Sequence, residues 1–494
     1  MHAEELIITL DTGRAGRRNP FHRQVFAQIR SAILDGRLRP ADKLPSTREL
    51  AGKLGLARNT VVRAYEDLLA EGYLEGKVGS GTFIAADLKA PSGALPGSSK
   101  PRAAKPGVRE PPGEQRSSGY LPFDFRPGIP DWDAFPRALW HRLIGRALRA
   151  NARELSRYGQ PAGYPPLRRA IARHLAISRG VVAGAEQVVI VSGSQQALDL
   201  IARLNLDPGE SVALEDPGYP EARQVLARQV SRPLFIPVDE DGLDVGALAR
   251  RSRKGPPPRL VYVTPSHQFP TGVTLSLARR LALLEWAARN GSLIIEDDYD
   301  SEFHGPGRAV ESIQGLDRAG SVLYVGTFST VLFPPLRVGY VVLPPGLVEP
   351  FVRAKWLADR QTPTLEQLAL TDFLEAGHFE RHLRRMRRLV SGRREALRDA
   401  IGRYFAGLLE PPRPGTGMHL LQPLPTRGLS LSPAALERLA VGRAAARGVG
   451  VYPLGPCHST PAKEAALLLG YAAMPEDRIR EGISILAEIM LPIL

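Results

Sequence analysis

The sequence predicts two folded parts: a small α+β domain of three helices and a two-stranded ribbon, then a large α/β domain with a mostly parallel sheet. Three observations lead to this prediction. At 494 residues the chain is too long for one ordinary domain. Apolar residues recur with helical spacing before position 86, whereas strand-like apolar runs alternate with helical stretches from about residue 123. We therefore divide the chain into residues 15–86, 87–121 and 122–494.

Composition narrows the class of protein. Hydrophobic residues make up 43% of the chain, which is enough for a sizeable core and argues against global disorder. The single cysteine, Cys457, excludes an internal disulfide framework and suits a reducing compartment. The first residues lack the pattern of a signal peptide, and no run approaches the roughly 18 apolar residues that cross a bilayer. We expect a cytoplasmic protein with no membrane partner and no metal site.

Three helices are predicted in the small domain. The first is amphipathic, can end at Gly36, and has apolar residues at four-residue spacing: Phe21, Val25, Ile29 and Ile33. The second, over 47–54, begins with a capping box of Ser46 and Glu49, and Gly55 breaks it. The third begins near residue 57 and places on one face Val61, Tyr65, Leu68 and Leu69. Two strands with a glycine-rich tip at 79–81 follow as a wing.

This order of elements is typical of a winged helix-turn-helix, whose recognition helix enters the major groove of double-stranded DNA. Between Arg14 and Arg63 there are twelve Lys/Arg against three acids, and the whole chain has a formal net charge of +14. Arg58 suits guanine, while Asn59 and Thr60 offer shorter base contacts. Ser46, Arg48, Thr60 and Arg63 are candidates for phosphate contacts. The alternative is a winged helix used only for protein contacts.

The large domain shows the alternation of strands and helices that predicts a parallel sheet. The expected strands are VVIV (188–191), LVYV (260–263), SLIIED (292–297) and VLYVG (322–326), and two of the helices are 165–179 and 276–290. The segment 87–121 that precedes this domain is rich in Pro, Gly and Ser and is expected to be a tether. Ligands of such sheets bind beyond the carboxyl ends of the strands.

Polar motifs follow several of these strands. Ser194 and Gln195 open a helix after a strand, where free N–H groups can bind phosphate, although small polar residues also cap ordinary helices. Tyr219 follows another strand and could stack on a planar ligand or pack at a turn. The turn TPSHQFPTG, 264–272, could present His267 and Gln268 to a ligand or only connect two elements.

The acidic run IIEDDYDSEF, 294–303, follows a strand predicted to be buried, where unpaired charges are costly. Asp297 could pair with a protonated pyridine nitrogen, and Tyr299 could donate to a phenolic oxygen; surface acids are the alternative. In the loop GTFSTVLFPPLRVG, 326–339, Thr327 and Ser329 can donate to phosphate, and Arg337 can bind it through two N–H groups.

These motifs occur in an order that resembles known regulators. LPSTRELAGKLGLARNTVVRAYEDLLAEGYLEGKVGSGTFI resembles the GntR winged-helix family, which implies that Arg48, Arg58 and the wing tip near Gly81 contact DNA. From about residue 20 to 490, motifs such as YGQPAGYPPLRRAIA, EDPGYP, TPSHQFPTG and FPPLRVGY resemble the MocR/GabR regulators. In these a GntR winged helix is fused to a fold-type I aminotransferase-like domain that binds pyridoxal phosphate.

The resemblance implies roles for individual residues and a homodimer, often with the DNA-binding domain of one subunit beside the large domain of the other. Asp297 would bind the pyridine nitrogen, Tyr299 the 3′-oxygen, and Tyr219 would stack on the ring. Ser194 with neighbours such as Gln195 would hold the phosphate, with Arg337 close to it.

Two positions depart from the family. The family has a lysine after Phe-Ser in the loop, where this chain has Thr330, which has no amine to attach pyridoxal phosphate. Nor can Thr330 transfer a proton at the ligand, a role that contributes about 10²–10⁴-fold in rate. A substitute lysine would have to be Lys254, Lys355 or Lys463. The second departure is Leu468, or a neighbour, where aminotransferases have an arginine for a substrate carboxylate; Arg126 or Arg223 could serve instead.

The sequence thus predicts a DNA-binding transcription regulator, with an operator in double-stranded DNA and a small-molecule effector. Its aminotransferase-like domain would sense pyridoxal phosphate, or a related vitamin B6 or amino-acid adduct, bound non-covalently and without transaminase activity. The alternatives are a working aminotransferase with an attached DNA-binding module and a cofactor-free dimerisation domain.

Overall fold

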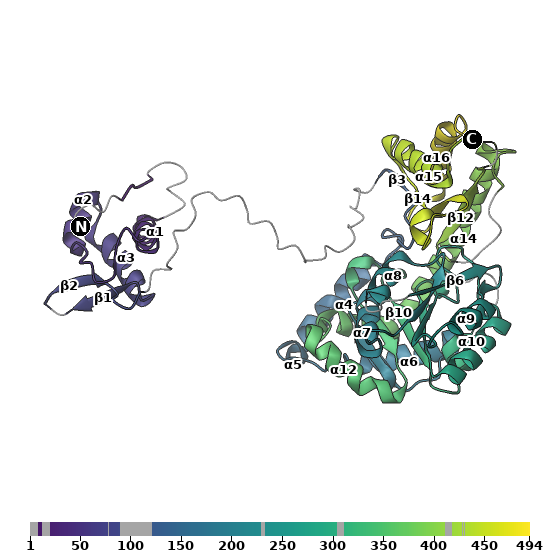
Figure 1. The fold of residues 1–494 in the computed structure, drawn as a ribbon, viewed down its shortest axis with the longest axis horizontal. Coiled ribbons are helices and arrows are strands. Elements are labelled where there is room, and N and C mark those ends of the chain that lie inside the picture. Colours follow the sequence, from purple (N-terminus) through teal and green to yellow (C-terminus); the bar gives the residue numbers. More distant parts are fainter. Residues whose placement is uncertain are drawn as a thin grey trace. The chain divides into compact units, whose positions relative to one another are not determined.

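The computed structural model describes residues 8–11, 20–77, 79–88, 121–228, 233–303, 311–410, 417–426, 428 and 430–494. Contacts between residues divide the chain into two units, 1–114 and 115–494, and each is described by itself (Figure 1). Apart from residues 87, 88 and 121, the predicted tether lies outside the described residues.

The first unit contains three helices and an antiparallel ribbon (Figure 1): α1 (Phe21–Leu34), α2 (Thr47–Leu54), α3 (Arg58–Ala70), β1 (Leu74–Lys77) and β2 (Gly81–Ile84). Its core joins all five elements and includes Val25, Ile29, Leu50, Val61, Leu68 and Ile84. The winged-helix prediction is therefore confirmed. Two residues of the predicted apolar faces lie outside this core, because Phe21 at the first turn of α1 is 38% exposed and Leu69 is 40% exposed.

Both ends of α2 form as the sequence predicts. The Ser46 hydroxyl accepts from the N–H of Glu49 at 3.2 Å, and the Glu49 carboxylate accepts from the N–H of Ser46 at 2.8 Å. At the other end of α2, Gly55 has φ +64°, a left-handed conformation that favours glycine. These caps fix where α2 ends and so where the first turn of α3 lies.

The second unit is built around an eight-stranded sheet in the order β4-β11-β10-β9-β8-β5-β6-β7. The strands, in this order, are Val188–Val191, Gly339–Val342, Val322–Thr327, Leu293–Asp298, Leu260–Val263, Val212–Asp216, Leu234–Asp239 and Gly242–Leu243. β11 runs antiparallel to both of its neighbours, and β7 runs antiparallel to β6; the other pairs are parallel. The prediction of a mostly parallel sheet is confirmed.

Helices cover both faces of this sheet, which explains why its strands are continuous apolar runs. One face packs against α7 (Ser194–Asn205), α8 (Pro220–Ala227) and α12 (Pro345–Asp359). The other packs against α6 (Pro165–Arg179), α9 (Val245–Ser252), α10 (Leu277–Asn290) and α13 (Thr364–Glu375). Alternate residues of β4 divide between the faces: Val188 and Ile190 point to one, Val189 and Val191 to the other.

A smaller antiparallel sheet, in the order β12-β15-β14, lies near the C-terminal end of this unit (Figure 1). Its strands are β12 (His419–Leu424), β15 (Ala465–Gly470) and β14 (Tyr452–Pro453). The remaining elements are β3 (Phe123–Asp124), α4 (Arg137–Ala150), α5 (Ala152–Leu155), α11 (Ile313–Leu316), α14 (His378–Tyr404), α15 (Pro433–Ala446), β13 (Val449–Gly450) and α16 (Glu476–Met490).

A largely enclosed histidine, with a side chain 10% exposed, connects α6 with α14. The two ring nitrogens of His174 lie 2.8 Å from Glu302 and 3.0 Å from Glu380. Burial opposes protonation of this ring, but the hydrogen bonds to Glu302 and Glu380 outweigh it and raise the pKa of His174 to about 9. The ring is therefore an imidazolium at neutral pH that donates to both carboxylates.

Across the described ranges, no helix has both the length and the apolar character needed to cross a membrane.

Candidate ligand and nucleic-acid sites

The residues predicted to contact DNA lie at the surface of the first unit. Arg58, Asn59 and Thr60 form the first turn of α3; Arg58 and Asn59 are exposed, and Thr60 is half-buried. Ser46 and Arg48, at the start of α2, are exposed as well. A guanidinium and short polar groups therefore stand at the start of two consecutive helices, as a helix-turn-helix requires.

Two further cations lie beside the ribbon: Lys77 at the end of β1 and Lys43, which forms a β-bridge to Phe83 of β2. Lys43 and Lys77 lie over the Phe83 ring, with their ammonium groups 5.9 Å and 5.2 Å from its centroid. Gly81, at the ribbon tip, has φ +116°, and a Cβ there would lie 3.0 Å from Cε of Lys43. Glycine at this position thus lets the Lys43 stem pass against the tip.

A cavity of about 410 Å³ lies in the second unit, at the carboxyl ends of the central strands, between the large sheet and the small one. The eight residues predicted to bind a cofactor all line it: Ser194, Gln195, Tyr219, Asp297, Tyr299, Thr327, Ser329 and Arg337. They come from four separate segments of the sequence, so the fold brings together what the motifs indicated one by one.

One end of the cavity is suited to an anion. Ser194 is the first residue of α7, so the N-terminal N–H groups of this helix lie at the cavity wall. Arg337 donates to the carbonyl of Ser192 at 2.6 Å. Gly193, the residue between Ser192 and Ser194, has φ +101°. A Cβ on Gly193 would lie 2.7 Å from the Arg337 guanidinium, so only glycine allows this approach. The Ser329 hydroxyl is buried in the same wall and has no hydrogen-bond partner.

Asp297 is the group best suited to a cationic N–H donor. It is 4% exposed, and its Oδ2 accepts from the Tyr262 hydroxyl at 2.8 Å, while its Oδ1 is buried without a partner. Burial, together with the nearby Asp298 and Asp300, raises the pKa of Asp297 to about 7, against a hydrogen bond from Tyr262 that lowers it. A buried carboxyl with one unpaired oxygen would be stabilised by a ligand that supplies both a proton donor and a positive charge.

Aromatic side chains complete the middle of the cavity. Gln195 Nε2 donates to the Tyr219 hydroxyl at 3.3 Å, and Phe269 contacts the Tyr219 ring edge-to-face with centroids 5.4 Å apart. The Tyr299 hydroxyl donates to the carbonyl of His267 at 2.9 Å and lies 3.1 Å from His267 Nδ1. Tyr219 and Tyr299 thus have fixed positions in the wall before any ligand binds.

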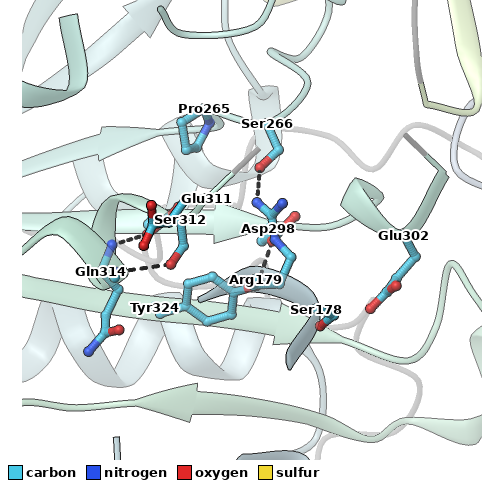
Figure 2. Close-up of polar contacts among 12 residues, drawn as sticks. Ser178, Arg179, Pro265, Ser266, Asp298, Glu302, Glu311, Ser312, Gln314 and Tyr324 are labelled. Carbon is cyan, nitrogen blue, oxygen red and sulfur yellow. Dashed lines mark hydrogen bonds and ion pairs between the residues drawn. The ribbon is translucent and has the colours of Figure 1, made fainter. Parts of the chain in front are cut away.

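The acidic run at the end of β9 and just after it divides into separate roles rather than forming one site. Glu296 accepts from the N–H groups of Ile313 and Gln314, both at 2.9 Å. Asp298 binds Arg179 at 2.8 Å and accepts from Tyr324; Arg179 also donates to Ser266 (Figure 2). Only Asp297 and Tyr299 of the run line the cavity. The surface-acid alternative does not hold, because Glu296, Asp297, Asp298 and Asp300 are all buried.

The turn at 264–272 presents a different residue from those predicted. His267 and Gln268 are 3% and 1% exposed, and they do not line the cavity. His267 Nδ1 lies 2.9 Å from Asp300, and Gln268 donates to Glu215 at 3.2 Å and to two backbone carbonyls. These two side chains hold the turn in place, and the next residue, Phe269, reaches the cavity instead.

Several wall residues had not been identified from the sequence. Tyr262 was identified only as part of the strand LVYV. Its hydroxyl could have been expected to matter, because it is the one polar group in an otherwise aliphatic strand, and this strand pairs with the strand that carries Asp297. The others include Glu221, Phe269, His419, Tyr452 and Cys457. The small sheet supplies some of them, and no motif in the sequence marks where that sheet packs.

Thr330 lines the cavity, and its hydroxyl donates to the carbonyl of Tyr299. None of the three lysines of the second unit is a substitute. Lys254 and Lys463 are exposed, and Lys355 is buried in α12, where it binds Asp359 at 2.8 Å. All three lie among the described residues, and none of them lines the cavity.

Comparison with known proteins agrees with both units. Residues 21–84 match the bacterial regulatory proteins of the gntR family, and residues 134–486 match aminotransferase class I and II. The second unit is similar to a crystal structure of LysN, the α-aminoadipate aminotransferase of Thermus thermophilus, complexed with N-(5′-phosphopyridoxyl)-L-leucine. The TM-score is 0.68 at 32% identity, over 75% of this chain and 92% of that one. The fold and the two sites define a winged-helix regulator fused to an aminotransferase-like domain.

Full-length relatives have the same architecture. The chain is 39% identical over 479 residues to the probable rhizopine catabolism regulatory protein MocR of Rhizobium meliloti, covering 96% of this chain and 94% of that protein. It is 31% identical to the pyridoxine biosynthesis transcriptional regulator PdxR of Corynebacterium glutamicum, covering 92% and 93%. The chain belongs to the MocR/GabR-type regulators, and it is a DNA-binding transcription regulator with an aminotransferase-like domain.

Proposed function

We propose that the aminotransferase-like domain senses pyridoxal phosphate, or a closely related vitamin B6 compound, held without a covalent bond, and that this changes operator binding by the winged helix. The observation that carries the proposal is the buried Asp297 with its unpaired Oδ1. Without a further partner this carboxylate is unfavourable, whereas paired with a protonated pyridine nitrogen it is stabilised.

The other residues fit the same compound. Ser194, Gln195, Thr327, Ser329 and Arg337 would hold its phosphate, since they combine a helix N-terminus, hydroxyl groups and a guanidinium. Tyr219 would stack on the ring, and Tyr299 would donate to the 3′-oxygen in place of the His267 carbonyl. The similar LysN structure contains a phosphopyridoxyl compound, and the name of the relative PdxR refers to pyridoxine biosynthesis.

Thr330 is the reason why we propose sensing rather than catalysis for this domain. Bound pyridoxal phosphate supplies an aldehyde and an electron-withdrawing ring, but its use in transamination also needs a lysine amine from the protein. A threonine hydroxyl neither attaches to the compound nor carries a proton at the substrate carbon, and no other lysine lines the cavity among the described residues. The wall can therefore bind and orient the compound and exclude water from it, without turnover.

On the nucleic-acid side, Arg58, Asn59 and Thr60 would read bases of a double-stranded operator. Ser46, Arg48 and the ribbon tip at Gly81, with Lys43 and Lys77 beside it, would contact phosphates. A homodimer would present two such units to two half-sites. A ligand that binds two arrangements of the dimer with different affinity shifts the population that binds DNA.

The test is a titration of the purified chain with pyridoxal phosphate, followed by equilibrium dialysis, visible absorbance and an operator gel-shift assay. We expect saturable binding that dialysis reverses, no covalent retention after borohydride treatment, and a change in operator affinity. Thr330→Lys should retain the compound covalently after borohydride, which shows that the pocket is competent. Absence of binding would leave a dimerisation domain without cofactor, and borohydride trapping on the unaltered chain with amino-acid turnover would mean an aminotransferase.

A further inference from the structure

The part of the cavity away from the phosphate seat is mostly apolar. The apolar residues of the wall outside the predicted cofactor-binding set include Phe269, Tyr452, Pro453, Pro456, Cys457 and Leu468. Leu468 lies in β15 opposite Tyr452 of β14 and Leu421 of β12, and it is 2% exposed. A ligand group that reaches this wall loses contact with water, so a charged group there needs a partner from the protein.

Positive charge is present near this wall but already compensated. Arg126 lines the cavity, yet its Nε donates to the Tyr452 hydroxyl at 2.7 Å and lies 3.3 Å from the Asp124 carboxylate. Tyr452 in turn donates to Asp124 at 2.6 Å. A carboxylate on a ligand would have to compete with Asp124, which is built into the fold beside the guanidinium.

Arg223, the other arginine considered for a ligand carboxylate, does not line the cavity. Its guanidinium donates to the carbonyls of His458 and Pro456, both at 2.6 Å, and thereby holds the turn that carries Cys457. The imidazole of His419 adds no positive charge to the cavity wall either. Burial lowers the pKa of His419 to about 3 and keeps its ring neutral.

The cavity wall also contains an acid. Glu221, in the first turn of α8, lines the cavity two residues after Tyr219. Its oxygens can accept hydrogen bonds from an amine. Aromatic rings, an aliphatic wall and one carboxyl together favour a cationic or neutral amine over an anion.

We infer that the effector which binds beside the cofactor is an apolar primary amine without a carboxylate, with its nitrogen at Glu221 and its carbon chain against Leu468. This inference rests on the proposed function, because the amine shares the cavity with pyridoxal phosphate. It narrows the effector to a chemical class: amines that remain when an amino acid loses its carboxylate.

The experiment uses the full chain, loaded with pyridoxal phosphate and freed of excess. Two ligand pairs that differ by a carboxylate are compared by calorimetry and by operator gel shift: 2-phenylethylamine against phenylalanine, and propylamine against 4-aminobutyrate. We expect each amine to bind at least about 10-fold more tightly than its partner, because the carboxylate would be desolvated without an available cation. Equal or tighter binding of the amino acids, or binding of neither class, overturns the inference.

Variants sharpen the same test. Glu221→Gln should weaken amine binding by about 10-fold, and the exposed Glu240→Gln, the same chemical change, should not. Leu468→Arg should shift the preference toward the amino acid of each pair. Uptake of pyridoxal phosphate is measured first: if the chain takes up none, the proposed function fails, whereas uptake without discrimination within the pairs refutes only the amine. The comparison on the unaltered chain stands even if Leu468→Arg does not fold.

Discussion

The two units arrange their polar side chains in opposite ways. In the winged helix, Arg48, Arg58 and Asn59 are exposed, in water and free of the core. In the aminotransferase-like unit, Asp297 and Tyr262 are buried and bonded to each other. Exposed charges act through interactions that salt screens, whereas buried charges act through the cost of leaving them unpaired. DNA binding should therefore respond to ionic strength, and ligand binding to the loss of single partners.

The largest effect expected from this contrast is on Asp297. Asp297→Ala removes the buried carboxylate and should lower affinity for pyridoxal phosphate by about 100-fold or more, since breaking a buried pair costs roughly 3–5 kcal/mol. Equilibrium dialysis measures it, with the exposed Asp207→Ala as the matched control. If both variants bind like the parent, the compound does not use this carboxylate.

Next in size is the loss of a base contact at the exposed site. Arg58→Ala should weaken operator binding by about 10–100-fold and reduce the preference for operator over unrelated DNA, because one bidentate base contact contributes about 1–3 kcal/mol. Gel shifts on a footprinted operator and on a scrambled duplex measure the loss of operator affinity and the change in preference for the operator. A uniform loss on both duplexes would instead assign Arg58 to phosphate.

A smaller effect should come from the ion pairs that His174 makes with Glu302 and Glu380 in the large unit. Because the pKa of His174 in the folded state, about 9, lies above its ordinary 6.5, the contribution of the imidazolium is fully present below pH 6.5 and is lost as pH rises through 9. His174→Gln should thus lower the free energy of unfolding by about 1–3 kcal/mol at pH 6, and by less at pH 9.5. Urea unfolding at the two values checks this, with the exposed His141→Gln as control. A loss that is the same at both values would mean that His174 stabilises by packing alone.

The smallest effect is expected for a phosphate contact. Arg48→Ala should weaken binding of operator and scrambled duplex by the same few-fold factor and reduce the slope of log affinity against log salt by about 0.9. Binding at several salt concentrations measures that slope. An unchanged slope would mean that Arg48 does not contact a phosphate. It would also weaken the distinction between a salt-sensitive DNA site and a salt-insensitive ligand site.

Local patterns were sufficient to predict most of the fold. β4, β8 and α6 have the predicted bounds, because an apolar run buried on both sides and a helix between Pro165 and Gly180 are marked by nearby residues. The direction of β11 was not predicted, since the antiparallel pairing of Gly339–Val342 with β4 and β10 depends on the path of the chain.

The candidate site was predictable only where a motif directly follows a strand. Asp297, Tyr299 and Ser194 were found in this way. Glu221 and Tyr452 were not given a place in the site, because they reach the cavity through the packing of α8 and of the small sheet against the large one. Leu468 was placed there only by the family resemblance. Long-range packing of this kind leaves no periodicity in the sequence. His267 and Gln268 show the converse, since polar residues in a suggestive turn proved to be buried supports.

The lone cysteine of the chain has a practical consequence. Cys457 lies in the cavity wall, is 4% exposed, and has its pKa raised by burial to about 12, so its sulfur is a protonated, shielded thiol at neutral pH. Every molecule therefore has a single built-in chemical reporter at the place where an effector would sit. Protection of this sulfur from a thiol reagent by an added ligand would report occupancy of the cavity, without any engineered probe.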